Sequence, residues 1–491
     1  MTGEQGKRFL IVVLDALRPE FVTPELMPNL HGFTQQGVRF ANSRSTFPTE
    51  TRVNQSAVTT GCYPARHGVV ANRFPLAQAS PGSILNSGDD VVFEATLKRL
   101  SGDLLMVPTL GEILALSGKR FATVSAGTSG GGRLINITAE RFGAFRLALR
   151  RPEAAVPRGI FETIAERLGP LPEYGVPALA WNSYAVDCYL DYVEPELQPD
   201  VMLLWLSEPD ESFHWHGIGS PEALGAISHM DAEFGRILSR QSAAIDAGSL
   251  QVIAMSDHGQ ISLAGGKLDL VARFDEAGLK ASGSPEGDPD YVVVVHNGGG
   301  VWVRDSDPGL IRRLVVWLRD QDWCGPVFTR GGVEGTLRHR EIRVDHPRAA
   351  DVVLALSSDD GMNEWGRAGR SADNAPYPEN GGCHGGLSRY ELENFIAMAG
   401  SAFRSRAAIE TPAGNIDILP TVLSVLGLGF DHRIDGRVLA EALSGHEEGA
   451  EDREDQARDL LLSSTNAVGR RTHLSVTEYR GVRYLNRAWA E

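Results

Sequence analysis

Carboxylates and imidazoles occur in this chain at spacings that suit metal binding. Asp210 and His214 are four residues apart, so on a helical turn both side chains lie on one face. Asp257 and His258 are adjacent at the end of a predicted strand, where a turn can direct them to neighbouring ions. His384 lies in the glycine-rich stretch GGCHGG. Because aspartate oxygens and histidine nitrogens bind borderline divalent ions, these residues predict a metal centre.

Two further residues extend this set. Asp15 follows the apolar run at residues 9–14, where the alternative role is to cap a helix. With Asp15 the set holds three aspartates and three histidines, a composition that suits two Zn²⁺ ions. Thr51 lies at the start of a helix predicted over 51–60, where the alternative role is again a cap. Coordination to a divalent ion lowers the pKa of a bound oxygen, so the predicted metal centre would activate a hydroxyl placed beside it.

The elements that must position these residues alternate between short apolar strands and helices. Strands are predicted over residues 8–16, 120–127, 200–210, 250–259, 291–303, 351–358 and 393–400. Helices are predicted over residues 51–60, 108–117, 221–240, 309–320 and 416–426. Apolar strands separated by helices indicate the α/β class, with a large, mainly parallel central sheet and helices on both faces. Asp15, Asp210 and Asp257 end three of the strands, so they are expected to converge at one edge of the sheet.

The order and wording of these motifs resemble the alkaline phosphatase superfamily, in particular its nucleotide pyrophosphatase/phosphodiesterase branch. The matching stretches, from residue 10 to about residue 428, are VLDALRPEF, MPNLHGFTQQGVRFANSRSTFPTETRVN, GCYPARHGVVAN, EPDESFHWHG, MSDHG, CHGG and NIDILPTVLSVLGL. The resemblance implies an alkaline-phosphatase-like fold with a single catalytic domain over residues 1–491. We expect a cap-like segment to be inserted at about 262–345. The implied activity is hydrolysis of a small-molecule phosphoester by a metal-dependent phosphodiesterase or nucleotide pyrophosphatase.

The resemblance implies two Zn²⁺ ions per chain and divides the predicted ligands between them. The first ion would take one aspartate and two histidines, which are Asp210, His214 and His384. The second ion would take two aspartates, one histidine and the reactive threonine, which are Asp15, Asp257, His258 and Thr51. His216, two residues after His214, is an alternative ligand.

The resemblance also implies roles around the reacting phosphorus. Thr51 would form a covalent phospho-threonine intermediate, and Asn72 matches a family asparagine that hydrogen-bonds a phosphoryl oxygen. Arg52 occupies the position where nucleotide-cleaving members commonly have phenylalanine. Its side chain could pair with a second anionic group of the substrate or could be solvated. This departure leaves phosphonate hydrolysis of the phosphonoacetate type, or phosphomonoester hydrolysis, as alternatives with the same metal core.

A second motif, CYPAR at residues 62–66, has the Cys-x-Pro-x-Arg pattern of sulfatases. In sulfatases the nucleophile stands ten residues before the glycine of a Thr-Gly pair. Counting back from Gly61 reaches Thr51, which is not followed by the required proline and arginine. We therefore expect Cys62 to be a structural thiol and His67 to be a scaffold residue.

The overall composition limits the partners of the chain. A formal net charge of −16 at pH 7 argues against a nucleic-acid polymer, although cations in a cleft can still attract a small anion. No apolar run approaches the length of a membrane span, and no secretory leader is visible, which predicts a cytoplasmic protein without a membrane. The four cysteines show no CxxC spacing and are expected to be reduced and buried. A homo-oligomer is allowed but not required.

Overall fold

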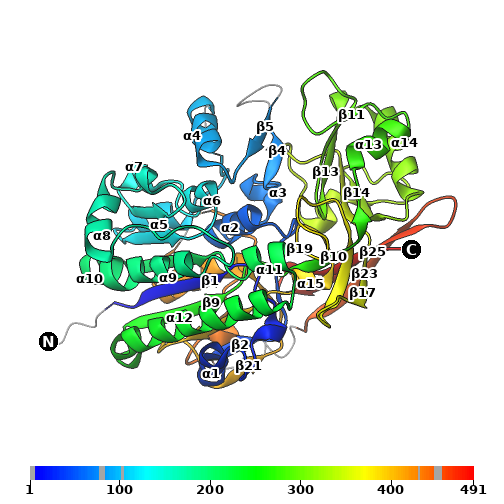
Figure 1. The fold of residues 1–491 in the computed structure, drawn as a ribbon. Coiled ribbons are helices and arrows are strands. Elements are labelled where there is room, and N and C mark those ends of the chain that lie inside the picture. The colour runs from blue at the N-terminus through cyan, green and yellow to red at the C-terminus, as the bar shows by residue number, and fades with distance from the viewer. Residues whose placement is uncertain (1–5, 77–82, 101–103, 430–431, 447–455) are drawn as a thin grey trace.

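An eight-stranded sheet lies at the centre of the fold (Figure 1). The computed structural model describes residues 6–76, 83–100, 104–429, 432–446 and 456–491. The strands of the sheet, in spatial order, are β21 (Ala407–Ile409), β2 (Val38–Phe40), β20 (Ile396–Ala399), β9 (Leu250–Met255), β1 (Arg8–Leu14), β8 (Val201–Leu206), β6 (Phe121–Ser125) and β7 (Phe145–Ala148). Neighbours from β9 to β7 are parallel, whereas β20 is antiparallel to both β9 and β2. The predicted mainly parallel sheet is confirmed.

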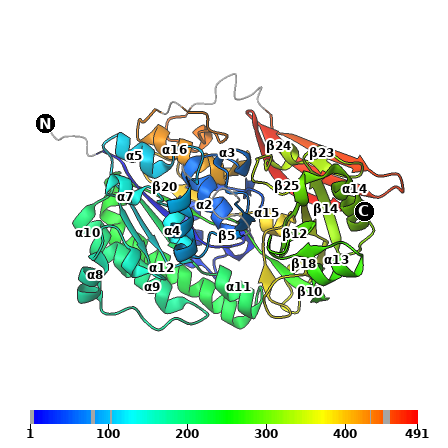
Figure 2. The same cartoon turned by 90° about the horizontal axis from the view of Figure 1, so that it is seen from above.

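Alternate side chains of the central strands are buried on opposite faces of the sheet. In β1, Leu10 and Val12 belong to one hydrophobic core, and Ile11 and Val13 belong to the other. The helices that contribute most to the first core include α1 (Pro28–Gln36), α9 (Leu179–Asp187) and α12 (Pro221–Asp246). The helices of the second core are α2 (Thr51–Thr60), α5 (Leu110–Leu116) and α16 (Ile418–Val425). Figure 2 shows α12 and α16 on opposite sides of the strands, and this double cover explains why the strands are continuous apolar runs.

The five predicted helices are present, one with the predicted bounds and four with shifted ends. Helix α2 ends where the sequence predicts because Gly61 follows in a left-handed conformation (φ 66°). Helix α12 runs on to Asp246, beyond the predicted 221–240, because no glycine or proline follows before Gly248. The remaining three are α5, which is shorter than the predicted 108–117, α14 (Pro308–Arg319), and α16, which begins two residues later than predicted. Among the described residues, no helix combines the length and the apolar character that crossing a bilayer requires.

Two predicted strands belong to a second sheet. Residues 291–303 form a hairpin of β12 (Tyr291–Val295) and β13 (Gly298–Val303), and residues 351–358 contain β16 (Val352–Leu356). These strands lie in the order β11-β12-β13-β16-β14-β15 and are completed by β11 (Ala281–Ser282), β14 (Cys324–Thr329) and β15 (Leu337–Arg338). The apolar runs correctly indicated buried strands, but they carried no information about which sheet each strand joins.

The second sheet lies beside the first and is covered by α13 (Leu270–Glu276) and α14 (Figure 1). A C-terminal sheet of β23 (Arg458–Thr465), β24 (Arg471–Tyr479) and β25 (Val482–Ala490) shares a hydrophobic cluster with β14 and β16. The range 262–345 therefore holds most of the second sheet, but not β16. Its assignment as an inserted cap, within one domain over residues 1–491, stays a prediction.

All four cysteines are free and buried, as predicted. Burial raises the pKa of the Cys62 thiol and of the Cys324 thiol to about 12, so both are protonated and unreactive at neutral pH. Cys62 is fully buried, beside the carbonyl oxygen of Arg433. These surroundings fit the structural role expected for Cys62.

His67 is expected to make the fold sensitive to acid. Its ring is fully buried, its Nδ1 accepts a hydrogen bond from Val69 N–H (3.1 Å), and burial lowers its pKa to about 3. Because the unfolded chain takes up a proton near the usual pKa of 6.5 and the folded chain does not, the free energy of unfolding falls as the pH is lowered from 6.5. At 1.36 kcal/mol per pKa unit, this one residue destabilises the fold by about 2 kcal/mol between pH 6.5 and pH 5.

The prediction is checked by urea unfolding of wild type and His67→Gln at pH 7 and pH 5. The wild type should lose about 2 kcal/mol more than the variant over this range. His31→Gln, a substitution on α1 at the partly exposed His31, is the matched control and should keep the wild-type pH dependence. Identical pH dependence in His67→Gln and wild type would contradict the prediction.

Candidate active site

The candidate site lies where β1, β8 and β9 end. Asp15 directly follows β1, and Asp257 follows β9 with one residue between them. Asp210 begins α11 (Asp210–His216), which comes after β8. Because β1 pairs in parallel with both β8 and β9, the three strands deliver these carboxylates to the same edge of the sheet. The structure thus brings together the three aspartates that the sequence predicted to converge.

One cluster of potential ligands contains Asp210, His214 and His384. Helix α11 places Asp210 and His214 one turn apart, and His384 enters from the loop after β19 (Gly382–Cys383). Asp210 Oδ1 lies 3.3 Å from His214 Nε2 and 3.5 Å from His384 Nε2. One ligand atom from each of the three residues falls within 4.8 Å of the others. This geometry can hold one metal ion.

The second cluster surrounds His258. Its Nε2 lies 3.2 Å from Asp257 Oδ2 and 3.7 Å from Asp15 Oδ1. Thr51 Oγ1 lies 3.3 Å from the same nitrogen, on the side of α2. Asp210 also has a ligand atom within 4.8 Å of those of Asp15 and His258, so it connects the two clusters.

The three histidines all present Nε2 to the site because Nδ1 faces a backbone carbonyl oxygen. These contacts are His214 Nδ1 to Gly382 O (2.8 Å), His258 Nδ1 to Gly259 O (3.0 Å) and His384 Nδ1 to Thr49 O (2.9 Å). A proton on Nδ1 leaves a lone pair on Nε2, which is the form that binds a metal ion. His216 is different, because its Nε2 faces the carbonyl oxygen of Val176 (3.3 Å) and it belongs to neither cluster.

The electrostatics of the site fit a bound cation. Burial, followed by the charges of Asp257 and Asp210, raises the pKa of the Asp15 carboxyl well above its usual range. Burial also raises the pKa of Asp257. Asp15 Oδ1 and Asp257 Oδ2 are buried and have no hydrogen-bond partner among the described residues. Unpaired carboxylate oxygens in a buried cluster require a proton or a metal ion, and the nitrogen and oxygen donors present here suit zinc.

The start of α2 brings Thr51, Arg52 and Asn72 together. Asn72 Oδ1 accepts a hydrogen bond from Arg52 N–H (3.0 Å), and the backbone N–H of Asn72 donates to the Glu50 carboxylate. The N-cap residue Glu50 makes no side-chain cap, so apart from that of Arg52 the first amide groups of α2 remain available for an anion. Thr51 is buried, with only 7% of its surface exposed.

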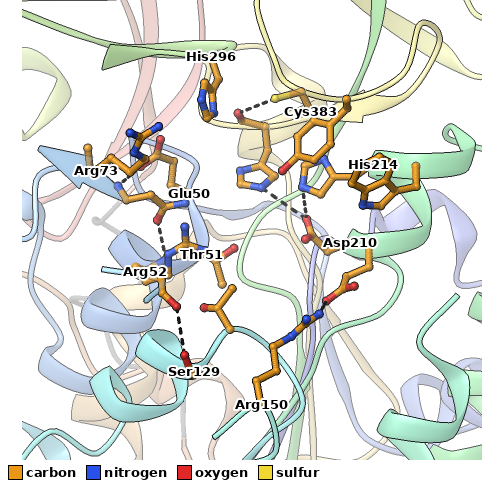
Figure 3. A pocket seen from close by; sticks show the side chains of 18 of the residues that line it. Glu50, Thr51, Arg52, Arg73, Ser129, Arg150, Asp210, His214, His296 and Cys383 are labelled. Carbon is orange, nitrogen blue, oxygen red and sulfur yellow. Dashed lines mark hydrogen bonds and ion pairs between the residues drawn. The ribbon is translucent and has the colours of Figure 1, made fainter. Parts of the chain in front are cut away.

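A cavity of about 560 Å³ opens over these groups. Figure 3 shows Thr51 between a wall that carries Asp210 and His214 and a wall that carries Arg52 and Arg73. The volume is that of a typical small-molecule site. The cavity is lined by Asp210, His214 and His384 of the first cluster and by Thr51, which lies beside the second cluster. It leaves space in which the remainder of a substrate can lie.

Three residues that hold the ligands in place were not predicted from the sequence. They are Trp205, whose Nε1 donates to Asp15 Oδ2 (2.9 Å), Gln260, whose Nε2 donates to Asp210, and Tyr377, whose ring stacks on His214 with centroids 3.8 Å apart. Gln260 follows His258 by two residues and could have been found by its position. Tyr377 lies in a stretch without a strand or helix pattern and gave no signal.

The strand order and the cluster at the strand ends define an alkaline-phosphatase-like α/β protein. The family model described as type I phosphodiesterase/nucleotide pyrophosphatase matches residues 9–306. This match covers more than half of the chain, and the chain belongs to this family. The resemblance noted in the sequence is thereby confirmed.

Individual relatives match over shorter stretches. Bis(5'-adenosyl)-triphosphatase enpp4 of Xenopus laevis is 33% identical over 72 residues, which are 15% of this chain and 16% of that protein. Venom phosphodiesterase 2 of Crotalus adamanteus is 22% identical over 278 residues, which are 55% of this chain and 29% of that protein. The matched stretches thus span less than a third of either relative.

A solved structure with the same fold covers nearly the whole chain. Murine ectonucleotide pyrophosphatase/phosphodiesterase 5, solved as an inactive variant in complex with AMP, superposes with a TM-score of 0.59. The superposition covers 89% of this chain and 100% of that chain at 16% sequence identity. This likeness supports the alkaline-phosphatase-like fold with its large, mostly parallel sheet.

Proposed function

We propose that the chain is a two-zinc phosphodiesterase in which Thr51 is the nucleophile. The observation that carries the proposal is the position of Thr51 Oγ1, 3.3 Å from His258 Nε2, at the N-terminus of α2 and beside both ligand clusters. Membership of the type I phosphodiesterase/nucleotide pyrophosphatase family supports a phosphoester as the substrate. The natural substrate is proposed to be a small molecule.

The proposed reaction has two steps at one phosphorus atom. In the first step, Thr51 Oγ forms a bond to phosphorus and loses its proton while the ester bond from phosphorus to the leaving oxygen breaks, and the leaving oxygen takes up a proton to depart as the alcohol. The phosphoryl group, still carrying its second ester, is then covalently bound to Thr51. In the second step, a water oxygen forms a bond to phosphorus and loses a proton while the bond from phosphorus to Thr51 Oγ breaks, and Thr51 Oγ takes up a proton to become a hydroxyl again.

The chain's own residues would bind and orient the phosphoryl group. Asn72 Oδ1 is held by Arg52 N–H, so the amide nitrogen of Asn72 is the end available to donate to a phosphoryl oxygen. The free amide groups at the start of α2 favour the same negative charge. The contacts from Nδ1 of the histidines to carbonyl oxygens keep the three imidazoles oriented.

Two Zn²⁺ ions per chain are proposed as cofactors. Residues of one site would be Asp210, His214 and His384, and residues of the other would be Asp15, Thr51, Asp257 and His258. Bound zinc would supply Lewis acidity, which lowers the pKa of the Thr51 hydroxyl and offsets charge on the phosphoryl oxygens.

A second candidate function keeps the metal core and changes the substrate to a phosphonate or a phosphomonoester. The observation that favours it is the guanidinium of Arg52, which faces the cavity without a carboxylate partner among the described residues. A guanidinium suits the carboxylate of a substrate such as phosphonoacetate.

A substrate panel separates these candidates. We expect the zinc-loaded protein to hydrolyse bis-p-nitrophenyl phosphate at least about tenfold faster than p-nitrophenyl phosphate, because a diesterase stabilises a transition state with one charge fewer on phosphorus. The initial rates are read by nitrophenolate absorbance, and metal analysis should find about two zinc ions per chain. Faster turnover of the monoester, or release of phosphate from phosphonoacetate alone, would contradict the diesterase and favour the second candidate.

A further inference from the structure

An unpaired guanidinium faces the cavity directly beside the proposed nucleophile. Arg52 is the second residue of α2, and its backbone N–H is fixed by Asn72 Oδ1. Its Nε is buried without a hydrogen-bond partner, and among the described residues no carboxylate lies within ion-pair distance of the group. A half-buried charge that the protein leaves unpaired is costly unless a ligand pairs with it.

The wall around Arg52 leaves the guanidinium accessible. The backbone of Gly88 passes beside it, and a Cβ at this glycine would lie 3.5 Å from Arg52 Nη2 and 3.6 Å from Cζ. Because glycine has no side chain, nothing from this position covers the guanidinium. Gly88 and Arg52 both line the cavity.

The charges near Arg52 leave this wall cationic. Arg73, at the start of β4 (Arg73–Pro75), is exposed, lines the same wall and has no ion-pair partner within the described part of the chain. Glu50 has the largest electrostatic effect on Arg52 among the acidic residues, and its single charge offsets part of the two positive charges without forming an ion pair with either arginine. Its carboxylate instead accepts a hydrogen bond from the backbone N–H of Asn72. Figure 3 shows Arg52, Arg73 and Glu50 on one side of the cavity, away from Asp210.

The opposite rim contains an arginine that is already neutralised. Arg150 Nη2 lies 2.5 Å from Glu211 Oε1, and its guanidinium lies over the ring of Tyr174, 4.1 Å from the centroid. His296 completes the upper wall, and burial followed by the charges of Arg73, His214 and Arg52 lowers its pKa to about 4. His296 is therefore neutral at pH 7, and the free positive charge of the cavity is concentrated at Arg52 and Arg73.

We infer that the cavity takes phosphoesters whose organic part carries a second anionic group, a carboxylate or a phosphate, and that Arg52, assisted by Arg73, binds this group. This inference rests on the proposed function and adds the substrate class. In a chain with a net charge of −16, two unpaired arginines on one cavity wall select an anion locally while the surface repels polyanions. The planar guanidinium favours a bidentate carboxylate or phosphate over a neutral group.

Matched substrates test the inference by turnover. The pair is p-nitrophenyl carboxyethyl phosphate and its methyl ester, which share the phosphodiester and the leaving group and differ in the second charge. Because the distance from phosphorus to Arg52 is not fixed by the protein, carboxypropyl and carboxybutyl members extend the series. We expect kcat/KM of the zinc-loaded enzyme to favour the carboxylate roughly 10- to 100-fold for at least one chain length.

Variants identify the group responsible. Arg52→Gln should reduce the preference for the carboxylate to less than about threefold. Arg52→Lys should keep part of the preference, because lysine retains the positive charge but lacks the planar guanidinium that binds a carboxylate with two hydrogen bonds. Arg150→Gln, which lines the same cavity but removes an already paired charge, should keep the wild-type preference. A preference that is absent at every chain length, or that survives Arg52→Gln, would overturn the inference.

Binding without turnover separates this inference from the proposed mechanism. Calorimetry on the zinc-loaded Thr51→Ala protein compares phosphonopropanoate with phosphonopropanamide, which lacks the second charge. We expect the carboxylate to bind roughly tenfold or more tightly, and the difference to disappear when Arg52→Gln is added. If Thr51 is not the nucleophile, the proposed mechanism fails but this difference persists. Equal affinities for the two ligands would overturn the inference whatever the role of Thr51.

Discussion

Replacement of Thr51 by alanine is expected to lower kcat for a phosphodiester by roughly 10⁴-fold or more, because it removes the oxygen that we propose forms the bond to phosphorus. Thr51 Oγ1 makes one side-chain contact, with His258 Nε2 at 3.3 Å, and it does not cap α2. The loss of activity should therefore come without a comparable loss of stability. Steady-state rates with bis-p-nitrophenyl phosphate and thermal unfolding of the same preparations measure both quantities.

Two substitutions control this result. Thr51→Ser keeps a hydroxyl at the same place and should retain measurable activity. Thr60→Ala removes a hydroxyl from the same helix, where it donates to Ser56 O (2.6 Å) far from the ligands, and should leave the rate within about threefold of wild type. Equal rates for Thr51→Ala and wild type would show that another group attacks phosphorus.

The proposed phospho-threonine intermediate gives an independent readout. Trypsin is expected to release Thr51 in the peptide 45–52, by cleavage after Arg44 and Arg52. Rapid acid quench during turnover should leave a phosphoryl adduct on this peptide, and mass spectrometry of Thr51→Ala should find none. An adduct on a different peptide would reassign the nucleophile.

The sequence predicted the elements that carry their own local signals. Helix α2 could be bounded because Gly61 supplies the left-handed residue that ends it, and β1 could be found because its six apolar residues stop at Asp15. The convergence of Asp15, Asp210 and Asp257 could be predicted because parallel strands end at one edge of a sheet. These inferences need only the residues themselves and the geometry of one strand or one turn.

The features that the sequence did not predict depend on contacts between distant segments. The hairpin at 291–303 has the same apolar pattern as the central strands, yet it pairs in the second sheet and brings His296 to the cavity. The stacking of Tyr377 on His214 joins residues that are far apart in the chain. Whether Arg52 is paired or free could not be decided either, because the answer depends on where Glu50 and Gly88 lie in space.

The carboxylate cluster leads to the second large expected effect, in which Asp15→Asn stabilises the metal-free protein and inactivates the metal-loaded one. Without metal, burial and the charges of Asp257 and Asp210 oppose ionisation of Asp15, so removing its charge should raise the free energy of unfolding by about 1–3 kcal/mol. The new amide can keep the hydrogen bond from Trp205 Nε1 (2.9 Å) through its oxygen. With zinc present, loss of this proposed ligand should lower kcat by about 10³-fold or more.

Urea unfolding of wild type and Asp15→Asn, each in a chelated and a zinc-loaded sample, tests whether the substitution stabilises the metal-free protein and weakens the stabilisation by zinc. Zinc should stabilise the wild type by an amount that grows with its concentration, and should stabilise Asp15→Asn much less. Asp231→Asn is the matched control, because Asp231 is equally buried but accepts hydrogen bonds from Leu30 N–H (2.8 Å) and Asn29 N–H (3.0 Å). It should destabilise the protein whether or not zinc is bound. If Asp15→Asn destabilises the chelated protein as Asp231→Asn does, the Asp15 carboxylate is stabilised by the protein itself, and the case for a metal ion at this cluster fails.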